Sequence, residues 1–116
     1  MAKVLCAGAD RILVETRVLI LRGAGHTAVP AMGDHEILAA CQEDGFDVVV
    51  IGQANMPKRD KQRVLEIVRQ HCSDVKVLEL YSPATGRSLK SADAWLEVPA
   101  LVPTDLALHV ERLATK

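Results

Sequence analysis

Aromatic residues are scarce in this chain of 116 residues: Phe46, Tyr81 and Trp95 make up 3% of it. Because apolar residues still account for 49% of the sequence, we expect a core built mainly from aliphatic side chains. A chain of this length predicts one domain, residues 1–116, that buries enough apolar surface to fold alone.

Neither sign of charge is in large excess, since the chain has 14 basic and 15 acidic residues and a net charge of −1. This balance gives no electrostatic reason to expect a nucleic-acid or anionic-membrane partner. No long apolar segment precedes the first expected strand, so we predict no signal peptide, no transmembrane helix and a cytoplasmic location.

Cysteines are few, odd in number and widely spaced: Cys6, Cys41 and Cys72. We therefore predict reduced thiols in a cytosolic protein and no disulfide framework. Cys6 precedes a loop that enters a helix, as in some phosphate-binding nucleophile loops, but Asp10 would repel a phosphate, and a buried core thiol is the favoured reading. The four histidines lie far apart, so we expect neither a metal site nor a cofactor.

Apolar periodicity predicts strands that alternate with helices. The expected strands are 3–7, 27–31, 47–51, 75–80 and 95–98, and the expected helices are 11–22, 34–43, 58–71 and 103–114. Asp10 and Asp34 are the candidate caps of the first two helices. This order indicates βαβ units and a doubly wound α/β fold, with five parallel strands in the flavodoxin-like order 2-1-3-4-5. In such sheets a ligand site lies at the carboxyl ends of strands 1, 3 and 4.

Two helices carry further signals. The charge run 58–63 opens the third helix and is typical of a solvated helix face. The first helix has apolar residues on more than one side, namely Ile12, Leu13, Leu19 and Ile20, which hints at a protein contact.

One run is especially informative: Asn55-Met56-Pro57-Lys58-Arg59-Asp60 follows the β-branched strand 47–51 after three intervening residues. Together with the runs at 3–5, 21–29 and 92–99, in this order and spacing, it resembles the receiver domain of response regulators over essentially the full chain. The resemblance implies two-component signal transduction, in which an aspartate after strand 3 receives a phosphoryl group.

The residues that match the receiver's chemical positions differ in type from those the chemistry needs. Gln53 stands at the phosphoacceptor, and its amide is not an anionic nucleophile. Gly8 and Ala9 match the acid pair that helps to hold Mg²⁺, although a small shift of alignment would let Asp10 supply one carboxylate. The remaining matches are Tyr81 or Ser82 at the Thr/Ser switch, Val98 at the lysine, and Trp95 at the aromatic switch.

Spacing predicts one more departure from the receiver pattern. Thirteen residues, 82–94, separate the fourth strand from Trp95, and they include Pro83 and Gly86. We therefore expect the fourth helix of a receiver to be short or absent.

We thus expect a stand-alone, degenerate receiver domain that is not an enzyme and acts through protein contacts. A histidine kinase, another signalling protein or a second copy of the chain are the candidate partners. The alternative is a small-ligand-binding flavodoxin-like module or enzyme that uses the crevice near Gly8, Gly52, Gln53 and Ser82.

Overall fold

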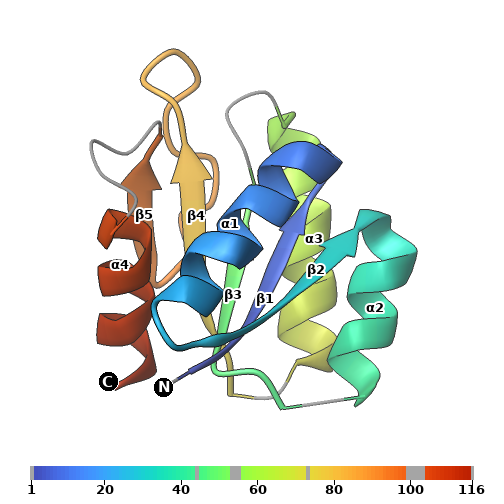
Figure 1. The fold of residues 1–116 in the computed structure, drawn as a ribbon. Coiled ribbons are helices and arrows are strands. Elements are labelled where there is room, and N and C mark those ends of the chain that lie inside the picture. Colours follow the sequence, from blue (N-terminus) through green and yellow to red (C-terminus); the bar gives the residue numbers. More distant parts are fainter. Residues whose placement is uncertain (1, 44, 53–55, 73, 99–103, 116) are drawn as a thin grey trace.

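The fold is a five-stranded parallel sheet in the order β2-β1-β3-β4-β5, as predicted (Figure 1). The computed structural model describes residues 2–43, 45–52, 56–72, 74–98 and 104–115. Within these residues the elements are β1 (Lys3–Gly8), α1 (Arg11–Gly23), β2 (Thr27–Met32), α2 (Gly33–Glu43), β3 (Val48–Ile51), α3 (Lys58–His71), β4 (Lys76–Tyr81), β5 (Ala94–Glu97) and α4 (Thr104–Ala114).

Helices cover both faces of this sheet, so its central strands are buried on each side (Figure 1). One core cluster joins α2 and α3 to one face, and the other joins α1 and α4 to the opposite face. All four residues of β3 are buried, because a central parallel strand packs against helices above and below. The predicted inward stripe of α1, Val14, Val18 and Leu21, is buried as expected.

Helix starts match the prediction at one place and differ at another. Asp10 caps α1, since its Oδ1 accepts hydrogen bonds from the amides of Ile12 and Leu13. Asp34 was predicted to cap the second helix, and this is wrong because α2 begins at Gly33, directly after β2. Asp34 instead lies in the first turn of α2 and forms an ion pair with Arg63 of α3.

No helix lies between β4 and β5, where every residue from 82 to 93 is described. The predicted loss of the receiver's fourth helix is therefore confirmed. The helix that closes the chain is α4, which follows β5.

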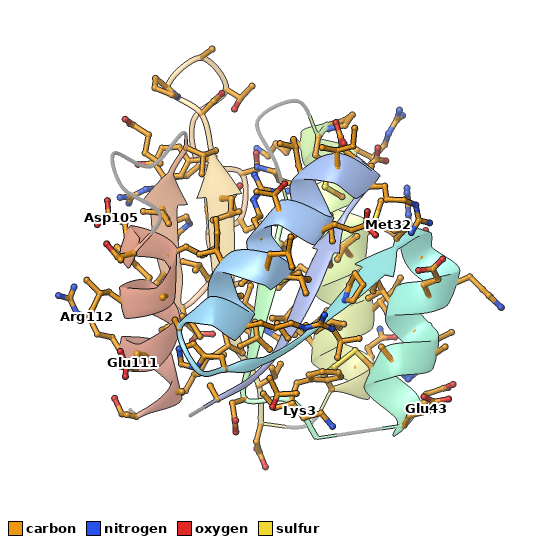
Figure 2. The ribbon with its side chains drawn as sticks, in the orientation of Figure 1. Lys3, Met32, Glu43, Asp105, Glu111 and Arg112 are labelled. Carbon is orange, nitrogen blue, oxygen red and sulfur yellow. A yellow bond between two sulfur atoms is a disulfide. The ribbon has the colours of Figure 1, made fainter. Side chains whose placement is uncertain are left out.

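The cysteines contradict one prediction. Cys41 at the end of α2 and Cys72 just after α3 form a disulfide, drawn as a yellow bond in Figure 2. The two residues are 31 positions apart in the sequence. They come together because α2 and α3 pack on the same face of the sheet. Cys6 is a free, buried thiol, as predicted.

Among the described residues, no helix has both the length and the apolar character needed to cross a membrane.

Candidate functional site

Parallel pairing brings the carboxyl ends of β1, β3 and β4 to one edge of the sheet. Ala7 lies beside Ile51, and Ile51 lies beside Glu79, so β1 and β3 end close together while β4 continues two residues farther, to Tyr81. This is the edge at which open parallel sheets bind ligands. Gln53, the phosphoacceptor match, lies outside the described residues, whereas its neighbour Gly52 is described.

The β1 side of this edge offers little for a cation. Gly8 has no side chain, and Ala9 ends in a methyl group. The Asp10 carboxylate accepts hydrogen bonds from the amides of Ile12 and Leu13 at 3.0 and 3.3 Å, so it caps the start of α1. Within the described part of the chain, no group of three His, Cys, Asp or Glu residues is arranged to hold a metal ion.

A buried ion pair occupies the α3 side of the edge. Lys61 Nζ donates to Glu79 Oε2 at 2.9 Å and to the carbonyl oxygen of Leu80 at 2.8 Å. The Lys61 side chain is 1% exposed and the Glu79 side chain 0%. Charges sealed away from water in this way persist only when each has an oppositely charged or hydrogen-bonding partner.

Lys61 also fills the space beside Gly52, the residue that follows β3. Gly52 has a φ of +99°, and a Cβ added to it would lie 2.7 Å from Lys61 Cε and 3.2 Å from the Leu80 oxygen. Only glycine meets both demands, since other residues disfavour this backbone region and need room for a side chain. The Lys61 stem therefore occupies part of the crevice that the ligand-binding alternative requires.

A second cation reaches Gly52 from the opposite face of the sheet. Arg17 of α1 donates from Nη1 to the Gly52 carbonyl oxygen at 3.0 Å. Burial lowers the pKa of Arg17, while the neighbouring Cys6 and Asp10 act in the opposite direction. The backbone at the end of β3 is thus held from both sides.

Glu79 ties the same edge to the segment that replaces the missing helix. Its carboxylate accepts the amides of Ser88 and Leu89 at 2.9 to 3.0 Å. Because a carboxylate accepts several hydrogen bonds at once, one buried residue satisfies Lys61 and two loop amides together. The pair therefore links α3, β4 and the loop in one network.

The remaining predicted positions lie farther along β4 and β5. The Ser82 hydroxyl lies 2.9 Å from that of Thr85, within a turn at the end of β4. Trp95 Nε1 donates to the Leu89 oxygen at 3.0 Å, and Arg87 lies over its ring at 4.7 Å. Val98 packs its apolar side chain against the α1 and α4 side of the core, so no lysine points back to the edge from this position.

Sequence reasoning missed Lys61 and Glu79. The prediction that run 58–63 forms a solvated face is wrong at Lys61, which is buried. A signal was present, because position 61 shares a helix face with the buried Val64, Leu65 and Val68. Glu79, an acidic residue between two leucines of β4, was the second signal, because a buried acid needs a partner such as Lys61.

No family model matches the sequence, and no curated protein is similar to it. Among solved structures, the receiver domain of a Francisella response regulator, 1452, is 26% identical with a TM-score of 0.79, and 99% of this chain and 98% of that chain are covered. The Vibrio cholerae chemotaxis protein CheY4 is 26% identical with a TM-score of 0.78, over 97% of this chain and 98% of that one.

A response regulator from Thermotoga maritima shares the fold with a TM-score of 0.82, although only 17% of residues are identical over 100% of this chain and 99% of that chain. The two neighbours that are 26% identical confirm the resemblance drawn from the sequence. The chain is a receiver-like domain, with the CheY-like fold of response regulators along essentially its whole length.

Proposed function

We propose that this chain is a signalling receiver that acts through protein contacts and without phosphorylation of an aspartate. The observation that supports it most strongly is the buried Lys61–Glu79 pair beside Gly52. A phosphorylation site at this edge would need an acidic, water-accessible pocket for Mg²⁺ and a phosphodonor. Here a sealed ammonium group takes up space next to the end of β3.

Residue types at the other positions support the same proposal. Gly8 and Ala9 supply no carboxylate, Val98 supplies no cation, and Gln53 has no anionic oxygen with which to attack phosphorus. An isolated acceptor, acid pair or lysine would leave an unbalanced charge in this region, so their joint replacement is physically coherent. The chain would then signal by the surface it presents to a protein partner, such as a histidine kinase or another signalling protein, and not by catalysis.

Phosphodonor treatment tests the proposal. The protein is incubated with acetyl phosphate and Mg²⁺, and its intact mass is measured beside a receiver that keeps its acceptor aspartate. We expect the mass of this chain to stay unchanged while the control gains a phosphoryl group. A hydroxylamine-sensitive phosphoryl adduct on this chain would overturn the proposal.

A matched variant tests whether the missing acceptor alone prevents phosphorylation. Gln53→Asp restores a carboxylate without restoring the acid pair or the lysine. We expect it to remain unmodified under the same conditions, because Gly8 and Ala9 still offer no ligand for Mg²⁺. Rapid modification of this variant would show that the edge is competent, contrary to the proposal.

A further inference from the structure

Helix α1 exposes an outward stripe that no other described part of the chain covers. Ile12 is 76% exposed and Leu19 is 67% exposed, on the side of the helix away from the buried Val14, Val18 and Leu21. In Figure 1, α1 lies across the front of the sheet, with α4 at one side and β2 at the other. Large apolar side chains at this exposure are typical of contact surfaces when they share one helix face.

Two charges of opposite sign border the stripe. Glu15 and Arg22 are seven residues apart, so two turns of helix place them on the same flank at about 10 Å. Both are exposed, and neither takes part in an ion pair within the described residues. Arg22 Nε donates to the Ala28 oxygen at 3.1 Å, which steadies the guanidinium on the β2 side of α1.

Shallow hollows lie on both sides of Leu19. One, of about 310 Å³, is lined by Glu15, Val18, Leu19, Arg22 and Pro30. The other, of about 250 Å³, lies between α1 and α4 and is lined mostly by apolar atoms. The same surface therefore presents a leucine side chain and the recesses that would receive one.

We propose that this face of α1 binds a second copy of the chain, with the two α1 helices antiparallel about a two-fold axis near Leu19. An antiparallel two-fold pairing places each Glu15 opposite Arg22 of the second copy, because the two residues lie at equal distances from the axis on one flank. Leu19 then meets its own counterpart at the centre. The opposite charges and the central leucine make the surface complementary to itself.

Charge complementarity is the reason to choose a second copy over another partner. The charges of Glu15 and Arg22 offset one another, so this pair does not favour a uniformly acidic or basic protein, but the pair is complementary to its own reverse. A single helix face is small, so the contact belongs to the weak class of interfaces, and we expect dimers only at high protein concentration.

The proposal extends the protein-contact role proposed above, and its test is independent of phosphorylation. Sedimentation velocity is recorded from about 10 μM to about 500 μM, the range suited to weak association. We expect a monomer–dimer equilibrium in the unmodified chain and its loss in Leu19→Asp. A chain that stays monomeric throughout would overturn the dimer and leave the phosphorylation result untouched.

Charge reversal tests the pairing itself. Glu15→Arg and Arg22→Glu each place like charges opposite one another, and we expect either change to weaken dimerisation about tenfold. The double variant exchanges the two signs and is expected to recover the original affinity. Glu43→Arg is the matched control on α2, on the opposite face of the sheet from α1, and is expected to change nothing (Figure 2).

Far-UV circular dichroism confirms that each variant is folded. A double variant no better than the single ones, or a Glu43→Arg variant that weakens the dimer equally, would contradict the antiparallel arrangement. Dimers that survive Leu19→Asp would place the interface elsewhere.

Discussion

Breaking the Lys61–Glu79 pair on one side should cost far more stability than its two hydrogen bonds suggest. Lys61→Met keeps the length of the side chain but leaves the Glu79 carboxylate buried with only the Ser88 and Leu89 amides. Glu79→Gln keeps a carbonyl oxygen for those amides but leaves the ammonium with only the Leu80 oxygen. We expect each single change to lower the free energy of unfolding by about 4 kcal/mol, because each strands a buried charge.

The double variant Lys61→Met with Glu79→Gln removes both charges together. Because no buried charge is then left without a partner, we expect a loss of about 3 kcal/mol, smaller than either single loss and well below the additive value of about 8 kcal/mol. Urea unfolding followed by far-UV circular dichroism measures all four members of the cycle. A domain of this length commonly has a free energy of unfolding of about 6 to 17 kcal/mol, so the variants should still fold.

A matched control cycle uses the exposed pair of Arg63 and Asp34, whose side chains are 50% and 41% accessible. Solvent screens this pair, so its coupling should be much smaller than that of the buried pair. If the Lys61–Glu79 cycle is additive to within about 1 kcal/mol, the two groups do not interact as a buried pair, and the description of this edge is refuted.

Three further predictions concern other parts of the chain. Reduction of the Cys41–Cys72 disulfide, which closes a loop of 31 positions, should lower stability by about 4 kcal/mol, and equal urea midpoints with and without reductant would contradict this. Burial raises the pKa of the Cys6 thiol from 9.0 to about 12, although Arg17 and Arg22 oppose the shift. As pH rises, the unfolded chain therefore loses this proton before the folded chain does, so the free energy of unfolding should fall between pH 9 and 12. The fall should be less steep in Cys6→Ala. Equal slopes of unfolding free energy against pH in the two proteins would exclude this linkage. Gly52→Ala should cost about 3 kcal/mol from positive φ and contact with Lys61, and an unchanged urea midpoint would show that the contact is absent.

The sheet followed from local pattern and connectivity. The β-branched run that became β3 is apolar on both faces, which only a central parallel strand requires. Once strands and helices alternate, right-handed crossovers leave few strand orders, and the observed one was among them. The missing helix followed from the small number of residues before Trp95, which leaves too little chain for a loop and a full helix.

The local pattern placed position 61 on the buried face of its helix, but it could not show which residue would pair with Lys61. Lys61 lies in a polar first turn, and its burial depends on Glu79, eighteen residues away on another element. The disulfide is also non-local, because Cys41 lies in α2 and Cys72 directly follows α3, and these helices come together only in the folded protein. Asp34 was misplaced for a local reason, since β2 runs into α2 without a separate capping residue.

We propose that the carboxyl edge of the sheet keeps one arrangement and does not respond to a phosphoryl group. The most direct measurement is the ¹H–¹⁵N NMR spectrum of the labelled protein, with and without Mg²⁺ and beryllofluoride, which mimics a phosphoryl group on aspartate. We expect unchanged amide resonances for Gly8, Gly52 and Ser82. Saturable shifts at these amides that require both Mg²⁺ and beryllofluoride would contradict it.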